Sequence, residues 1–317
     1  MRPFERINIL LRNTVPFFKD KTIIIPSIKR LILFVFLQFI AMMSVISLLS
    51  GFHIKIGFYL IVFWLIVYIY SVYFNIKMRV VQSTLVYGNI TNKPLDLKEA
   101  TLSVELSKSR IVTLAIFEKI IDLFFDDRDG DISKQKFGEA NKAIPLGFGL
   151  INQLMAGSIL ALSSAAKNYL LPAVVVDKDS IHGAIEKAKT LKSNIPEAIY
   201  GSASVEVISI PIVFFLRILD IFLCLSGAVV GILFGELLPK SLQIELSKQL
   251  VIGTYIPDVV SVTPLVFSIF LSLLFWKMFK ITKELIEVVY YTVLYVYTNY
   301  PDKIKTELRD DVKSFLK

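Results

Sequence analysis

The sequence predicts an all-α, polytopic membrane protein with about six transmembrane helices and several interfacial amphipathic helices. Hydrophobic residues account for 55% of its 317 residues, and the mean hydropathy is +0.64. Soluble domains contain only about 45–50% apolar residues, so this excess indicates a membrane protein. Several uncharged runs also approach the roughly 20 residues that an α-helix needs to cross a bilayer. We expect a single membrane-embedded domain over residues 1–317, with a cytoplasmic interfacial helix (1–30), a membrane bundle (31–279) and C-terminal cytoplasmic or interfacial helices (280–317).

The N-terminal part predicts a surface helix followed by two spans. Residues 2–18 place apolar side chains on one stripe and basic ones elsewhere, which is typical of an interfacial amphipathic helix, here bent near Pro16. A loose basic tail is the alternative. Residues 31–49 and 57–74 are uncharged runs long enough to cross a bilayer. The stretch between them predicts a tight turn outside the membrane.

The next part of the chain is more polar. Residues 75–105 predict a connection that contains a turn. Residues 111–125 are apolar but carry Glu118, Lys119 and Asp122, and each such charge costs about 2.5–3.5 kcal/mol at the bilayer centre. This segment is therefore either a tilted span or a helix packed in the interface.

A run rich in small residues, 147–171, predicts a span whose backbone can approach other helices closely. Pro172 breaks this helix, because proline has no N–H to donate. The charged segment 180–193 then predicts an amphipathic helix lying on the membrane surface.

Residues 199–238 are too long for one simple span, because about 40 helical residues rise about 60 Å, twice the hydrocarbon thickness. Pro211 divides the run, as does the pair formed by Arg217 and Asp220. Two full crossings are excluded, since they would put the basic C-terminus outside. Glycines at every fourth position of the second half predict a face that packs against the helix at 147–171. The expected helix-packing residues are Gly157, Gly227, Gly231 and Gly235.

Residues 259–279 predict the last span, which is followed by a tyrosine-rich helix (285–297) and a charged amphipathic tail from Pro301. Basic residues concentrate before residue 31, after residue 276, and within 75–105 and 167–196. Because cytoplasmic loops carry an excess of lysine and arginine, these segments are expected in the cytoplasm. Both termini then lie on the cytoplasmic side of the cell membrane, and the number of crossings is even.

Four stretches carry a resemblance to a known family. They read KDKTIIIP at 19–26, YLLPAVVVD at 169–177, GAIEKAK at 183–189 and YTVLYVY at 291–297. On these stretches the chain resembles a family of prokaryotic multi-pass membrane proteins of unknown function. More distantly, it is similar to the membrane domain fused to some glycerophosphodiester phosphodiesterases. The resemblance implies a polytopic helical fold and brings no catalytic residues.

The sequence contains no recognised motif for catalysis, metal binding or nucleic-acid binding. With two histidines and one cysteine, no zinc site or histidine-based triad can be assembled. We therefore expect no catalytic residues, no metal, no cofactor and no specific nucleic-acid partner, and attribute the net charge of +8 to basic residues at the cytoplasmic membrane face. The best candidates are charged residues in apolar surroundings, which are functional suspects by default. These candidate intramembrane residues are Glu118, Lys119, Asp122, Glu206, Arg217 and Asp220.

Three functions remain open. The favoured one is a non-catalytic scaffold or assembly subunit that binds membrane lipids, and protein partners or further copies of itself through small-residue helix faces. A pore or transporter subunit for a solute or polymer is the alternative, and an inverted repeat of broken helices would indicate it. A membrane lipid-modifying enzyme is the third, and it requires acids or histidines clustered at one membrane face. Arg217 and Asp220, three residues apart, can form an ion pair that is either structural or functional.

Overall fold

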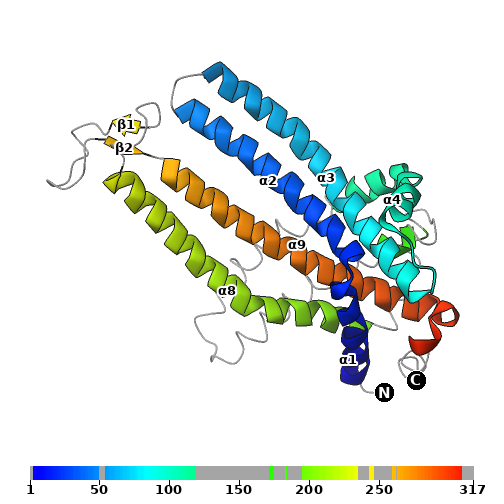
Figure 1. Cartoon of the computed structure of the whole chain (residues 1–317). Coiled ribbons are helices and arrows are strands. Elements are labelled where there is room, and N and C mark those ends of the chain that lie inside the picture. Colours follow the sequence, from blue (N-terminus) through cyan, green and yellow to red (C-terminus); the bar gives the residue numbers. More distant parts are fainter. Residues whose placement is uncertain are drawn as a thin grey trace, which may run out of the picture. The chain divides into compact units, whose positions relative to one another are not determined.

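The computed structural model describes residues 3–49, 54–116, 118, 171–174, 183, 195–234, 243–245, 259–261 and 263–308. Most of these residues are helical, and the described strands form one short antiparallel pair (Figure 1). The elements are α1 (Pro3–Thr14), η1 (Val15–Lys19), α2 (Lys21–Leu49), α3 (Ile54–Ile90), α4 (Leu97–Glu105), α8 (Ile195–Leu233), β1 (Gln243–Glu245), β2 (Val259–Ser261), α9 (Thr263–Asn299), η6 (Pro301–Lys303) and η7 (Thr306–Leu308).

Within the described residues, four helices are long and apolar enough to cross a membrane. They are Lys21–Leu48, Lys55–Ile90, Ser209–Leu233 and Thr263–Asn299. A helical fold with several candidate spans is thus confirmed for this part of the chain, whereas the count of about six is not. Of the two further predicted spans, 147–171 lies outside the described residues except for its last position. The described part of 111–125 is helical and buries Ile111, Leu114 and Ala115.

The chain divides into two compact units. Unit 1 consists of Met1–Ile28, Tyr73–Val207 and Lys283–Lys317, and unit 2 of Lys29–Val72 and Ile208–Thr282. Each of the four long helices contributes residues to both units.

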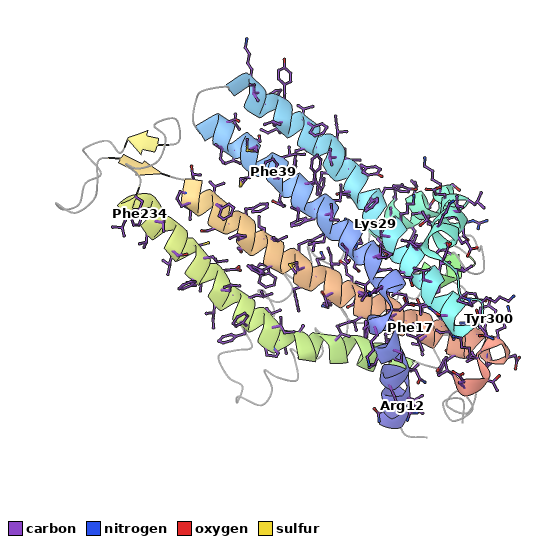
Figure 2. The ribbon with its side chains drawn as sticks, in the orientation of Figure 1. Arg12, Phe17, Lys29, Phe39, Phe234 and Tyr300 are labelled. Carbon is purple, nitrogen blue, oxygen red and sulfur yellow. The ribbon has the colours of Figure 1, made fainter. Side chains whose placement is uncertain are left out.

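Unit 2 has an apolar surface. Large hydrophobic side chains are exposed along all four of its helical segments, for example Phe39 in α2 (Figure 2), Ile66 in α3, Phe214 in α8 and Phe267 in α9. A soluble protein rarely exposes so much contiguous apolar surface. Lipid tails, in contrast, are as apolar as these side chains, so exposing the side chains to lipid costs little free energy.

Neighbouring helices of unit 2 follow the order α3, α2, α9 and α8 (Figure 1). The Ser44 hydroxyl of α2 donates a hydrogen bond of 3.0 Å to the carbonyl of Gly57 in α3. The ammonium of Lys277 in α9 lies 5.1 Å from the centre of the Phe34 ring in α2. Polar groups thus contribute to the contacts between these helices.

Helices α8 and α9 approach closely at Gly227. A Cβ atom at this position would lie 2.9 Å from the carbonyl oxygen of Pro264 and would collide with the Ser268 side chain. Gly231, one turn further on, is also buried, whereas Val230 is exposed. The described neighbour of Gly227 is therefore α9. The predicted partner, 147–171, lies outside the described residues except for its last position.

Unit 1 has a hydrophobic core of its own. The second halves of α3 and α9 supply most of it. Residues of α1, α2, α4, the segments 111–115 and 171–174, and Ile304 add to it. Helix α1 and the following η1, which contains Pro16, match the predicted amphipathic helix with its break. The largest buried aromatic side chains of this core are Tyr290, Tyr291, Tyr295 and Tyr297.

The end of α3 forms a tight turn toward α4. Asn92 adopts a left-handed conformation with φ 58°, and the N–H of Lys93 donates to the carbonyl of Gly88 over 2.9 Å, a common way to end a helix. A Cβ atom on Gly88 would lie 2.7 Å from the Lys93 carbonyl oxygen, so a side chain there would open the turn. Helix α4 then begins with a capping box formed by Asp96 and Glu99.

Helices α3 and α9 extend further toward their C-terminal ends than the sequence predicted, and α9 begins later than predicted. Helix α3 continues to Ile90 and α9 to Asn299, through residues that their polarity assigned to a connection and a separate helix. Their polar side chains are buried in unit 1, so they do not end the helices. Residues 259–261, predicted as the start of the last span, form β2 instead, and α9 begins at Thr263.

Helix α8 is a single element of 39 residues, with Pro211 inside it. Its second part, Ser209–Leu233, is the candidate span. The long apolar run thus contains one candidate span within a longer helix, in line with the rejection of two full crossings.

The close contact at Gly227 leads to a first prediction. In Gly227→Leu the new side chain must displace the backbone at Pro264. We therefore expect the free energy of unfolding to fall by about 1–3 kcal/mol, the usual cost of overpacking. Val230→Leu, on the exposed side of the same helix, is the matched control and should unfold like the wild type. Thermal unfolding in mild detergent measures both variants, and equal melting temperatures would contradict the packing described here.

Candidate functional site

Polar side chains of α3 lie inside the core of unit 1. Gln82 is fully buried, and its amide group donates to the carbonyl of Ile23 (3.0 Å) and to the hydroxyl of Ser27 (2.8 Å), both in α2. Burying an amide without partners is costly, so these bonds fix α3 against the first turns of α2. The same end of α2 is capped by Asp20, whose other carboxylate oxygen accepts from Asn89 of α3 at 3.2 Å.

A second buried contact joins α3 to α9. The hydroxyl oxygens of Ser83 and Thr292, both fully buried, lie 2.9 Å apart. Thr292 already donates its single hydrogen to the carbonyl of Val288 at 2.7 Å. Ser83 is therefore the donor of the bond between the two helices.

The strongest polar contact is an ion pair. Nη1 of Arg79 lies 2.8 and 3.0 Å from the two carboxylate oxygens of Glu118, and both residues are less than a tenth exposed. Glu284 and Glu287 of α9 add further electrostatic attraction on Arg79. In surroundings of low dielectric such charges persist only when they are paired, so Arg79 and Glu118 depend on each other.

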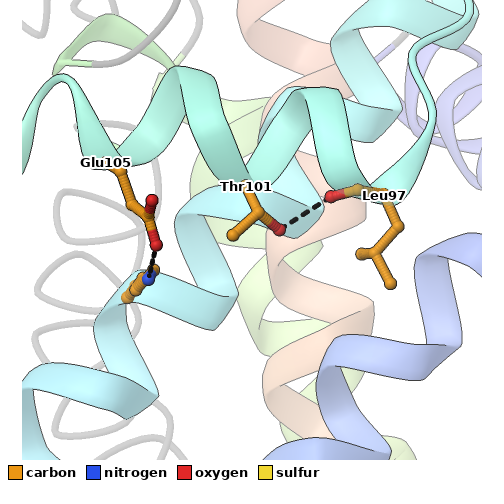
Figure 3. Close-up of polar contacts among 4 residues, drawn as sticks. Leu97, Thr101 and Glu105 are labelled. Carbon is orange, nitrogen blue, oxygen red and sulfur yellow. Dashed lines mark hydrogen bonds and ion pairs between the residues drawn. The ribbon is translucent and has the colours of Figure 1, made fainter.

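An exposed ion pair lies near by on the same helix. Lys77 donates to the carboxylate of Glu105 at the end of α4 over 2.7 Å, and Thr101, one turn earlier, donates to the carbonyl of Leu97 (Figure 3). The hydrogen bond and then the charge of Lys77 lower the pKa of Glu105. The contact thus contributes stability above the ordinary pKa of glutamate, and the contribution is lost as the pH falls through the lowered pKa.

The C-terminal segment covers the end of α3. The backbone N–H of Lys305 donates to the carbonyl of Ile90 over 3.0 Å, which satisfies an acceptor that the helix leaves open at its end. The ring of Tyr300 meets that of Tyr87 edge to face, with 6.3 Å between centres. On α1, Asn13 donates to the hydroxyl of Tyr297 (2.9 Å).

Of the charged residues singled out in the sequence, Glu118 lies in the ion pair of unit 1 and Asp220 lies in unit 2. The Asp220 carboxylate accepts hydrogen bonds from the Ser272 hydroxyl and the Trp276 indole, both on α9. Arg217 is exposed, and among the described residues no ion pair joins it to Asp220.

The remaining candidates are less informative. Glu206 belongs to α8, and Gly227 and Gly231 were placed above. Lys119, Asp122, Gly157 and Gly235 lie outside the described residues.

The polar contacts that Arg79, Gln82 and Ser83 of α3 make inside unit 1 were not predicted from the sequence. The sequence did contain a signal for a helix here. Arg79 and Ser83 are four residues apart and therefore share one helix face, a spacing that a polar loop has no reason to show. In the described part of the chain, no three histidine, cysteine, aspartate or glutamate residues could together hold a metal ion.

No family model, curated protein or solved structure matches this chain. The resemblance to the membrane domain of glycerophosphodiester phosphodiesterases therefore stays a prediction.

The two ion pairs of α3 provide a matched test. Glu118→Ala leaves the buried Arg79 without its main counter-charge. We therefore expect the free energy of unfolding to fall by about 3–5 kcal/mol. Glu105→Ala removes the exposed partner of Lys77 and should change the stability little. Thermal unfolding in detergent compares the two variants. If Glu105→Ala lowers the melting temperature as much as Glu118→Ala, the buried ion pair contributes no more to stability than the exposed one.

Proposed function

We propose that this protein is a non-catalytic scaffold of the cytoplasmic membrane, in which four transmembrane segments anchor a helical unit on the cytoplasmic side. One observation carries the proposal. Along each long helix, side chains in the unit 2 segment face outward as bare hydrocarbon, whereas α3 and α9 bury theirs in a core within unit 1. An exposed apolar surface of this kind is stable in lipid, whereas a unit that buries its own core does not need lipid around it.

The lengths of the segments support this arrangement. The parts of α2, α3 and α9 that belong to unit 2 are each about 20 residues long, as a hydrocarbon layer of about 30 Å requires. Helix α3 as a whole has 37 residues and rises about 55 Å, so it continues well past the bilayer. Outside the lipid its remaining turns need other partners, which unit 1 supplies.

The distribution of basic residues supports the orientation. Lys29 and Arg30 stand where α2 enters unit 2, and Lys280 and Lys283 stand where α9 leaves it. At the opposite ends of the helices, the connections carry only Lys55, Lys240 and Lys248 as basic residues. An excess of positive charge beside the membrane favours the cytoplasmic side, so unit 1 and both termini are assigned there.

An apolar surface on unit 1 supports the role of a scaffold. Leu106, directly after α4, is 91% exposed, and Leu102, Val112 and Ile116 are exposed near it in the sequence. Outside lipid, grouped apolar side chains of this kind mark an interaction site. Basic residues lie among them, so the surface fits a protein segment with an apolar face bordered by acidic side chains.

The orientation can be tested with single cysteines in a Cys224→Ala background. Cysteine at Lys55 should react with a membrane-impermeant thiol reagent in intact cells, because it lies at the outer ends of α2 and α3. Cysteine at Lys98, equally a surface lysine, should react only after the cells are opened. The reverse pattern would overturn the assignment.

A cysteine at Ser133 distinguishes four spans from six. With four spans it lies on the cytoplasmic side and is protected in intact cells, whereas the six-span arrangement places it outside. Labelling of this position in intact cells would therefore contradict the four-span proposal.

The scaffold itself is tested by photo-crosslinking in native membranes. A photoreactive amino acid at Leu106 should yield a discrete protein adduct, and Leu102→Asp in the same chain should reduce its amount several-fold. The same amino acid at Lys303, which is exposed on another part of unit 1, is the control and should yield no such adduct. Adducts with lipid alone would contradict a protein partner at this surface.

A further inference from the structure

Helix α8 presents an unusual residue to its surroundings. Along its candidate span the outward side chains are large and apolar, among them Phe214, Ile218 and Ile221. Arg217 lies among them and is also exposed. Among the described residues, it forms no ion pair and no hydrogen bond through its side chain.

The depth of Arg217 makes this exposure costly. The candidate span Ser209–Leu233 is centred on Ile221, so Arg217 lies one turn, about 6 Å, from the middle of the bilayer. An arginine near the centre of a membrane helix is costly even on insertion scales. Such residues are found beside a counter-charge, and that counter-charge has to come from outside the described bundle.

Asp220 offers a counter-charge at a similar depth. Its carboxylate accepts from Ser272 and Trp276 of α9, which fixes its position at the edge between the α9 contact and the exposed face. A carboxylate has about four acceptor sites, and these two bonds leave room for a further donor. The side chain is half-buried, so one side of it remains accessible.

From these features we infer that a second copy of this chain packs along α8, with Arg217 of each copy paired to Asp220 of the partner subunit. The two charges balance each other, so one helix face complements itself. A two-fold axis along the membrane normal makes such an interface isologous and keeps both copies at the same depth. The inference rests on the proposed position of unit 2 in the bilayer.

The spacing of residues on this face fits a pair of parallel helices. The positions 210, 214, 217, 221 and 224 follow alternating steps of four and three residues, the pattern of a left-handed helix pair. They are occupied by Ile, Phe, Arg, Ile and Cys, so apolar side chains surround the charge. Gly227 packs on α9 within the same chain and remains outside this interface.

Disulfide crosslinking in native membranes tests the contact. In a Cys224→Ala background, Ile221→Cys should form a disulfide-linked dimer on mild oxidation. Ile66→Cys in α3 is the matched control, because Ile66 and Ile221 are each 62% exposed on unit 2. Equal crosslinking at both positions, or none at Ile221, would overturn the inference.

A double-mutant cycle tests the charges. Arg217→Gln and Asp220→Asn should each weaken the dimer about tenfold, measured as the monomer–dimer equilibrium of the full-length protein in lipid nanodiscs or mild detergent. The double variant should be no weaker than either single variant, because a shared contact can be lost only once. Simple addition of the two effects would mean that the residues do not meet.

The conservative substitutions keep the outcome interpretable. Asn at 220 can still accept from α9, and near-normal melting temperatures of both variants would show that the bundle is intact. If Arg217→Gln leaves the dimer unchanged, the arginine binds a lipid phosphate or another segment of its own chain, and the inference is wrong. The cysteine labelling at Lys55 and Lys98 is independent of dimer formation, so a failure of the dimer and a failure of the membrane placement give different results.

Discussion

A helix in lipid cannot unwind, because each exposed backbone N–H or C=O there lacks water to bond with. This constraint keeps α3 and α9 unbroken through their candidate spans, and both helices continue for further turns within unit 1. Unit 1 is built on those continuations: α3 contacts α2, α4, α9 and the C-terminal segment through side chains that lie within five turns.

Polar contacts give unit 1 its specificity. Apolar side chains such as Val80, Val81 and Leu85 bury surface but tolerate several rotations of a helix about its axis. Gln82, Ser83 and Arg79 do not, because each must meet its own partner or remain buried and unsatisfied. In unit 2, Asp220 and the close approach at Gly227 have the same role.

The sequence predicted the four candidate spans of the described chain because each contains a long, predominantly apolar run, and runs of that kind depend only on local composition. It did not predict how far α3 and α9 extend, since Lys77, Arg79 and Gln82 resemble a loop unless their partners are known. Those partners, Glu105, Glu118 and Ser27, are distant in sequence, and so is α9, the neighbour of Gly227. The spacing of residues on one helix indicates which face packs against another element, but it does not identify that element.

The core of unit 1 is formed by residues that are far apart in the sequence, and this has a consequence for biosynthesis. This core combines residues near the N-terminus, the end of α3 and residues 283–308, so it cannot close until the last of these has left the ribosome. Until then Ser83 and the apolar residues beside it lack their partners on α9, and a nascent chain in this condition is prone to misassembly. Membrane insertion and completion of unit 1 are therefore separate events in time, and a chaperone or the inserting machinery has a defined interval in which to protect α3.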